Sequence, residues 1–351
     1  MPLRLSVLDQ SPIRPGATAR QALLETIALA QLADRLGYHR FWVSEHHNTH
    51  TLAGSAPEVL IAHLGNHTQR IRLGSGGVML PHYSALKVAE NFRLLETLFP
   101  GRIDLGLGRA PGGDRLTAYA LNPHNKFDDK EFAEQLMDLQ AYLRDDRVPE
   151  TIHERVMATP QAASVPALWL LSSSGQSGLF AAHLGAAFSF AQFINPKGGP
   201  AAVAQYRQRF RPSAELPEPE ANLAIFVLCA ETEEKARQLR AATDLQLLRF
   251  GKGERLTYPS AEEVAAYQFT PEDEIHLAHN RNRVVSGTPE QVRVQLTKLA
   301  ADYDVDEIVV VTITADFQDR LRSYELLAEA FALPAHAEVP STKFVPVPSL
   351  A

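Results

Sequence analysis

The sequence predicts a (β/α)8 barrel, which is a closed sheet of parallel strands surrounded by helices. Short apolar or β-branched segments alternate along the chain with amphipathic segments of helical period, a pattern typical of parallel sheets. Several of these segments are apolar at nearly every position, as in Ile308, Val309, Val310 and Val311, which indicates strands covered on both faces. Such barrels commonly run to about 250 residues or more as one domain, so a chain of 351 residues need not be divided.

Eight predicted strands follow one another along the chain. They cover residues 3–9, 40–45, 71–79, 103–108, 167–171, 186–193, 222–230 and 307–314. With seven crossover segments and a closing helix at about 316–331, they fit a barrel better than an open doubly wound sheet, which is the alternative for this pattern. We therefore expect one α/β barrel domain over 1–333 and an irregular, proline-rich tail over 334–351.

Capping boxes and insertions complete the expected fold. In a capping box, the side chains of two residues three positions apart satisfy each other's backbone amides at a helix start. The predicted boxes are Thr18 with Gln21, Ser55 with Glu58, and Thr288 with Gln291. Residues 195–221 have room for a loop, a short helix and a second loop. Residues 251–285 are polar, and a long insertion there would lie over the strand ends, so we expect an active-site lid.

The composition argues against several classes of protein. A formal net charge of −7 disfavours a nucleic-acid partner, because phosphates require a basic surface. The single cysteine, Cys229, can form neither an internal disulfide nor a cysteine zinc cluster. No apolar segment is long enough to span a membrane, and residues 1–9 read as a strand and not as a signal peptide. We expect a cytoplasmic enzyme without nucleic-acid or membrane partners.

Ionisable side chains gather at the end of the second predicted strand. Barrels place their reactive groups at strand ends, and here Glu45, His46 and His47 follow one another. One interpretation is an acid–base or hydrogen-bonding cluster that faces a ligand. The alternative is a solvated loop with incidental histidines. A metal site that includes His50 is disfavoured, because no carboxylate stands at a recognisable spacing, and we expect no metal.

Glycines interrupt the third predicted strand. Gly74, Gly76 and Gly77 lie inside an apolar segment, where glycine costs stability because it is flexible and has no side chain to pack. Close approach of a flat ligand to bare backbone would explain them. A bulge or a bend of the barrel is the alternative.

Arg109 follows the fourth predicted strand. The glycines before it resemble a dinucleotide-binding motif, but Pro111 stands where the helix of that motif would begin, so we reject that function. The guanidinium offers a planar fork of donors that suits a phosphate. The alternative is an ion pair with Asp104 or Asp114.

A serine-rich loop follows the fifth predicted strand. Ser173, Ser174, Gly175 and Ser177 stand before a helix, where small residues leave backbone amides open to an anion. Plain N-capping is the alternative, although one serine would suffice for it. The sequence around Ser177 lacks the G-x-S-x-G elbow of serine hydrolases. The strand ends together therefore predict a pocket for a phosphorylated, planar cofactor.

The motifs at these strand ends resemble those of the bacterial-luciferase-like monooxygenases. They are Glu45-His46-His47, the glycine segment 73–81, the segment Gly101-Arg102-Ile103-Asp104-Leu105-Gly106-Leu107-Gly108-Arg109, and Ser286-Gly287-Thr288-Pro289-Glu290-Gln291. The match runs from about residue 3 to about residue 330. The joint pattern is specific, although no single motif is.

The resemblance implies a luciferase-like barrel that binds reduced FMN, which reacts with O2. His46 matches the histidine that the family uses in flavin and peroxide chemistry, with Glu45 and His47 in support. Gly76 and Gly77 match a non-proline cis peptide under the flavin ring. Residues 251–285 coincide with the family's mobile loop. The family's phosphate-binding positions fall on Arg109, Ser174, Gly175 and Ser177.

The resemblance also implies partners. A separate NAD(P)H:flavin reductase would supply the reduced flavin, a small organic substrate would be oxygenated, and the chain would form a homo-oligomer such as a dimer. An F420-dependent dehydrogenase on the same barrel and a non-catalytic flavin-binding protein are the alternatives. Light emission is not expected, because most of the family does other chemistry. The region after Phe193 shows no pattern that identifies the organic substrate.

Overall fold

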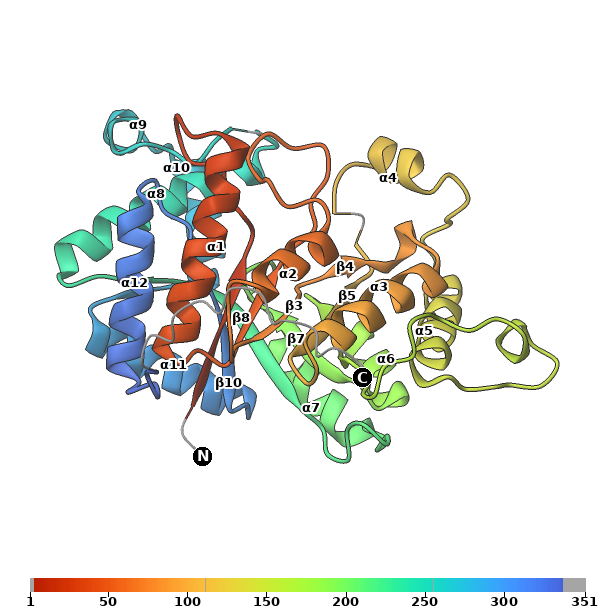
Figure 1. Cartoon of the computed structure of the whole chain (residues 1–351). Coiled ribbons are helices and arrows are strands. Elements are labelled where there is room, and N and C mark those ends of the chain that lie inside the picture. Colours follow the sequence, from red (N-terminus) through yellow and green to blue (C-terminus); the bar gives the residue numbers. More distant parts are fainter. Residues whose placement is uncertain (1–2, 111, 255, 337–351) are drawn as a thin grey trace.

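The first and last strands of the sheet pair with each other and close it, as the computed structural model shows (Figure 1). The structure describes residues 3–110, 112–254 and 256–336. β10 (Glu307–Val311) pairs in parallel with β1 (Arg4–Asp9) on one side and with β8 (Ala221–Cys229) on the other. This double pairing confirms the predicted barrel and excludes the open doubly wound sheet.

The barrel wall consists of parallel strands with helices against their outer face. In order around the barrel, the strands are β1, β2 (Arg40–Val43), β3 (Arg72–Ser75), β5 (Ile103–Gly108), β6 (Ala167–Ser172), β7 (Ala187–Ala191), β8 and β10. The outer helices are α1 (Ala19–Leu36), α2 (Pro57–Gly65), α3 (Ala85–Leu98), α5 (Asp129–Arg144), α6 (Gln176–Leu184), α7 (Gly199–Arg209), α8 (Glu233–Gly251), α11 (Pro289–Tyr303) and α12 (Phe317–Ala330). Every predicted strand overlaps an observed one.

The third predicted strand, 71–79, is divided in two. β3 ends at Ser75, and the short β4 (Val78–Met79) pairs with β5. The Gly76–Gly77 peptide bond between them is cis, as the resemblance implies. The strand is interrupted at the two glycines, which allow the chain to turn between β3, paired with β2 and β5, and β4, paired with β5.

A further strand, β9 (Val284–Gly287), lies in and beside the stretch that the sequence predicted as an insertion. It pairs with the second half of β8. The amide of Phe193, just after β7, donates to the carbonyl of Ala224, and the amide of Ala230 donates to the carbonyl of Gly287. Backbone groups at every second residue of a strand face the same edge, so Ala224 and Ala230, six positions apart, bond along one edge of β8. β9 therefore pairs with the same edge of β8 as β7 does, beyond the point where β7 ends.

Two of the three predicted capping boxes are confirmed. The Thr18 amide donates to the Gln21 side chain at 2.8 Å, and the Thr288 amide donates to the Gln291 side chain at 3.1 Å. The box of Ser55 with Glu58 is wrong, because α2 begins one residue later with Ala56 as its uncapped N-cap. Pro57 occupies the first helical position, as it prefers to, and so shifts the register.

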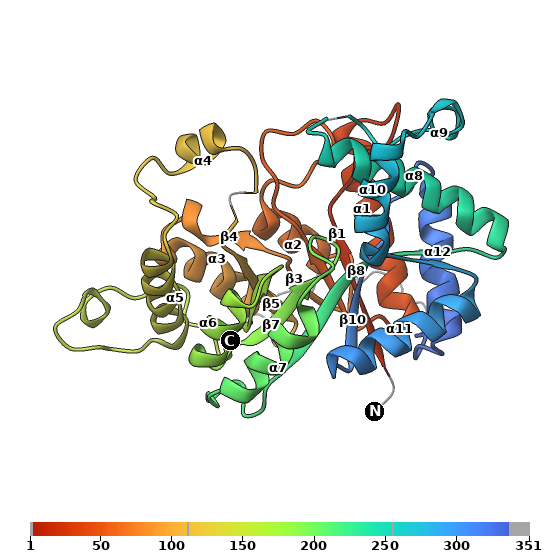
Figure 2. The same cartoon turned by 180° about the vertical axis from the view of Figure 1, so that it is seen from behind.

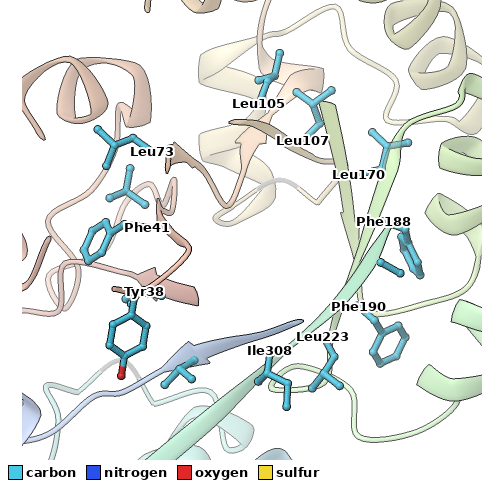
Figure 3. Packing of buried hydrophobic residues seen from close by; sticks show 14 of the residues in the cluster. Tyr38, Phe41, Leu73, Leu105, Leu107, Leu170, Phe188, Phe190, Leu223 and Ile308 are labelled. Carbon is cyan, nitrogen blue, oxygen red and sulfur yellow. The ribbon is translucent and has the colours of Figure 1, made fainter. Parts of the chain in front are cut away.

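Alternate strand positions separate an outer core from an inner one. The outer side chains pack between strands and helices, and Figure 3 shows Phe41, Leu73, Leu105, Phe188, Leu223 and Ile308 among them. The inner cluster fills the middle of the barrel with Leu8, Trp42, Trp169, Ala187, Ala224, Val309 and Val311. This division is the two-residue period of strands covered on both faces.

A network of buried charges fills the barrel interior at the amino ends of the strands. Arg40 of β2 donates to Asp104 of β5 at 3.0 Å, to Glu307 of β10 at 2.7 Å and to Glu220 at 3.0 Å. Asp104 also accepts from the indole of Trp42. The network thus occupies the interior at this end of the barrel with charged groups that are already paired with one another.

The segments outside the barrel pattern gather at the carboxyl ends of the strands. α4 (Arg115–Leu121), α9 (Ala261–Ala266) and α10 (Pro271–Asn280) lie at this end in both views (Figures 1 and 2). The predicted insertion 251–285 therefore contains two helices and the start of β9, while 195–221 contains α7 between two loops, as expected. Of the predicted tail, 334–351, the structure describes residues 334–336, which form neither a helix nor a strand, and the rest lies outside the described residues. Within the described ranges, no helix has the length and apolar character needed to cross a membrane.

Candidate active site

A cavity of about 260 Å³ opens at the carboxyl ends of the strands. Of the predicted site residues, it is lined by Gly76, Gly77, Arg109, Ser173, Ser174 and Ser177. Gly175 is the N-cap of α6, which follows directly. Two larger hollows, of about 630 and 460 Å³, lie beside Arg4 at the amino ends of the strands. We assign the site to the smaller cavity, because barrel enzymes bind their substrates at the carboxyl ends.

The glycines beside this cavity are required by the packing of the sheet. A Cβ atom on Gly106 would lie 2.0 Å from the carbonyl oxygen of Ser75, and one on Gly77 would lie 2.7 Å from that of Gly106. Backbone atoms cannot move aside as a flexible side chain can. Close packing therefore explains the glycines, and it leaves the backbone of Gly76 and Gly77 as a bare surface of the cavity.

Arg109 forms an ion pair that the sequence did not predict. Its guanidinium contacts the carboxylate of Asp129, in the first turn of α5. Neither predicted alternative is found: Asp104 pairs with Arg40, and Asp114 caps α4 and accepts from Asn48. The side chain of Gln176, the first residue of α6, donates to the same Asp129 carboxylate. Arg109 and the start of α6 are thus adjacent.

The serines after β6 do not cap α6. The helix begins at Gln176 without a side-chain cap, so the amides of its first turn have no serine oxygen as acceptor. Ser172 instead accepts from the amide of Ser174 at 3.1 Å, and Ser177 is 6% exposed. The N-capping alternative is therefore not supported. What remains is a helix start, with serine hydroxyls and Arg109 beside it, that suits an anion.

Glu45 lies at the centre of a buried hydrogen-bond cluster behind the cavity. Its side chain is fully buried and accepts from the Met79 amide at 2.9 Å and from the Tyr83 hydroxyl at 2.8 Å. His47 Nε2 lies 2.7 Å from the same carboxylate. The carboxylate thus fixes the backbone of Met79, a residue that lines the cavity.

His46 is held as a neutral ring. Burial and the neighbouring His47 lower the pKa of His46 to about 4. Its Nδ1 lies 3.0 Å from the Ser44 hydroxyl. A neutral imidazole carries one donor and one acceptor nitrogen, so it can hold or pass a proton at physiological pH. Among the described residues that line the cavity, Glu45, His46 and His47 do not appear.

The structure adds residues to the site that sequence reasoning missed. Apolar side chains of the wall are Leu8, Trp42, Met79, Leu171, Phe193 and Ile194. Most of them belong to strands that were predicted, so strand-end position alone would have selected them. Asp129 had no such signal, because it lies on a helix that is remote from Arg109 in sequence.

The residues present fit a flat, apolar group with an anionic tail. The cavity combines the bare backbone of Gly76 and Gly77 with the apolar side chains of Trp42 and Leu171. At its edge lies the uncapped start of α6 beside Arg109. In the described part of the chain, no group of three or more His, Cys, Asp or Glu side chains has the arrangement that a metal ion requires.

Known proteins share this sequence and architecture. The family model described as luciferase-like monooxygenase matches residues 3–304. An uncharacterised protein of Bacillus subtilis, YwcH, is 53% identical over 93% of this chain and 99% of its own length. N-acetyl-S-alkylcysteine monooxygenase of the same organism is 40% identical over 93% of this chain and 98% of its own. The crystal structure of apo-MsnO8 has a TM-score of 0.89 at 41% identity and covers 95% of this chain and 100% of its own.

Proposed function

The chain belongs to the luciferase-like monooxygenase family, and from that premise we propose that it is the oxygenase of a two-component system. It would use reduced FMN and O2 to oxygenate a small organic substrate, and a separate NAD(P)H:flavin reductase would supply the reduced flavin. The observation that carries this proposal is the pairing of an anion site with a bare, flat backbone surface in one cavity.

We propose that the phosphate of FMN binds at the start of α6. Arg109, the hydroxyls of Ser173, Ser174 and Ser177, and the backbone at Gly175 would hold it. The uncapped helix start supports this role, because an anion there accepts from unsatisfied amides and is stabilised by the helix dipole. Bound reduced flavin supplies the electrons that activate O2.

The remaining residues of the cavity would orient the cofactor and exclude water. Gly76 and Gly77 offer the flat surface, and Trp42 and Leu171 close the cavity on other sides. His46 would hold or transfer a proton through its neutral ring, while Glu45 and His47 keep that segment in place. We further propose that 251–285, with α9 and α10, acts as a lid; proteolysis of this segment should then slow when FMN is added.

Two mixing experiments test this function. An anaerobic titration with FMNH2 and with reduced F420 identifies the cofactor, and binding of F420 alone would replace the monooxygenase by an F420-dependent dehydrogenase. Rapid mixing of the protein–FMNH2 complex with O2 then measures hydrogen peroxide release. We expect slower release than from free FMNH2. Hydrogen peroxide release at the rate of free FMNH2 would contradict the monooxygenase function and support a non-catalytic flavin-binding protein. N-acetyl-S-alkylcysteine, on which a relative acts by its name, is the first substrate to test.

Substitution of Arg109 tests the phosphate site. Arg109→Ala should weaken FMN binding by about tenfold or more, because a charge-assisted bidentate contact is lost. Riboflavin binding should change far less, since riboflavin has no phosphate. Equal losses for both flavins in fluorescence titrations would refute the proposed role of Arg109.

We also propose a homo-oligomer, such as a dimer, in solution. Apolar side chains are exposed on two neighbouring outer helices: Val59 on α2 is 68% exposed, and Leu94 and Leu98 on α3 are 50% and 56% exposed. Such a surface is stabilised when a second copy covers it. Light scattering should then give a mass of about twice 38.7 kDa.

A further inference from the structure

The proposed phosphate site, which should be positively charged, contains a carboxylate, that of Asp129. It forms an ion pair with Arg109 and accepts from Gln176, which begins α6. Arg109 lines the cavity. A phosphate that approaches the Arg109 guanidinium would therefore find its N–H donors already bound by the Asp129 carboxylate.

Capping of α5 does not explain the position of Asp129. The N-cap of α5 is the preceding residue, Asp128, whose side chain accepts from the Glu131 amide at 2.7 Å. The side chain of Asp129 is 54% exposed, and that of Arg109 is 33% exposed. Both partners of the pair are therefore accessible to solvent and to a ligand at the edge of the cavity. An exposed pair of this kind is weak, so an anion that binds the guanidinium more strongly can displace the carboxylate.

We propose that Asp129 is a built-in competitor for the phosphate of the cofactor. Its carboxylate holds Arg109 until the phosphate displaces it, and its charge then continues to repel the phosphate. This inference rests on the proposed function. The consequence is a lower affinity for the phosphorylated flavin than the same site would have without the charge of Asp129. The flavin can therefore leave the site and return to the reductase that reduces it.

Three features of the pair favour competition over a purely orienting role. Asp129 contacts both elements of the proposed phosphate site, Arg109 and the start of α6. The contact with Gln176 is made by the side chain of the first residue of α6, a helix whose start has no side-chain cap. A second anion in the same place satisfies the same donors, so the two anions exclude each other.

Fluorescence titration with oxidised FMN and with riboflavin tests the competition. Asp129→Asn should lower the Kd for FMN by about fivefold to tenfold, the size of one weak ion pair plus a like-charge repulsion. The Kd for riboflavin should change less than twofold. Glu134→Gln is the matched control, because Glu134 lies on the same helix and pairs only weakly with Lys130, at 3.7 Å. It should leave both Kd values unchanged.

The Arg109→Ala background separates competition for Arg109 from a general effect of charge. In that background, Asp129→Asn should tighten FMN binding by clearly less than in the wild-type background, because no guanidinium remains to be withheld and only the like-charge repulsion is relieved. Weaker FMN binding by Asp129→Asn, or an undiminished gain in the Arg109→Ala background, would overturn the competitor role alone. A wild-type protein that binds FMN no better than riboflavin, with Arg109→Ala without effect, would overturn the phosphate site and the competitor together.

Discussion

Two partly buried histidines, His39 and His46, are held neutral by their surroundings. Burial, and then the charge of Arg40, lower the pKa of His39 to about 4, and burial with His47 does the same for His46. The Arg4 guanidinium lies 3.3 Å from Nε2 of His39, a contact that suits an unprotonated nitrogen. Both rings therefore resist protonation in the folded state only.

This difference predicts how stability depends on pH. An unfolded histidine titrates near 6.5, so between pH 6.5 and 4 the unfolded state binds more protons than the folded state. The free energy of unfolding should therefore fall as the pH falls through this window, by at most about 1.4 kcal/mol per pH unit for each histidine. His39→Gln should make the fall shallower. Urea unfolding of both proteins between pH 7 and 4 measures it, and parallel curves would contradict the assignment.

At the scale of elements, the contact between β3 and β5 depends on glycine. Gly106 of β5 lies so close to Ser75 of β3 that a Cβ atom would meet a carbonyl oxygen. Ser75 in turn donates from its hydroxyl to the Gly106 carbonyl and accepts from the Gly106 amide. β3, which leads directly to Gly76 and Gly77 at the cavity, is thus joined to β5 by backbone and hydroxyl groups, with no room for a side chain between the two strands.

Gly106→Ala should therefore destabilise the barrel by about 1–3 kcal/mol or more, because backbone would have to shift. The matched control is Gly251→Ala at the end of α8, where an added Cβ atom meets nothing within 4 Å. That substitution should change stability by no more than about 1 kcal/mol, and in the stabilising direction. The free energies of unfolding in urea decide. Similar values for the two variants would show that β3 and β5 can separate.

The segments added to the barrel define its active end. α4 and the pair α9 and α10 lie at the carboxyl ends of the strands (Figures 1 and 2). Lys252, just after α8, forms an ion pair at 2.6 Å with Asp273 of α10, which is fully buried. Both residues belong to 251–285, so this contact joins the start of the proposed lid to α10. The ion pair between Arg249 of α8 and Glu263 of α9, at 3.2 Å, ties the proposed lid to the body of the barrel.

At the scale of the whole molecule, Arg40 connects distant parts of the barrel. Its guanidinium is 2% exposed and bonds to carboxylates on β5, on β10 and before β8. Two of those carboxylates, Asp104 and Glu307, are fully buried. Because ionised groups in a dry interior require partners, one side chain satisfies charges from across the sheet.

Arg40→Leu should lower the free energy of unfolding by about 3–5 kcal/mol, because it leaves buried carboxylates without their cation. Arg4→Leu is the control at the same end of the barrel. The side chain of Arg4 is 34% exposed, and its shortest ion pair is with Asp306 at 2.9 Å, while Glu220 and the buried Glu307 lie at 3.6 and 3.9 Å and keep Arg40 as a partner. The loss of Arg4 should therefore cost about 1 kcal/mol. Denaturant unfolding of both variants measures the difference. A cost for Arg40→Leu near that for Arg4→Leu would show that the carboxylates find other partners.

The barrel and the strand ends that carry the candidate site could be predicted from the residues alone. Hydrophobic period is a local property of the chain, so runs such as 307–314 could be recognised without knowledge of their neighbours. The order of the strands then followed from the rules for parallel connections. For the same reason, Arg109 and the serine loop could be placed at neighbouring strand ends before their partners were known.

Which side chains meet at those strand ends became clear only from the folded chain. Arg109 pairs with Asp129 and not with Asp104 or Asp114, and Glu45 accepts from Met79 and Tyr83 behind the cavity. β9 forms because β8 runs beyond β7 and leaves an edge without a partner. These contacts depend on how helices and loops pack after the chain has folded. No period or spacing along the sequence records such packing, since the partners lie on separate elements.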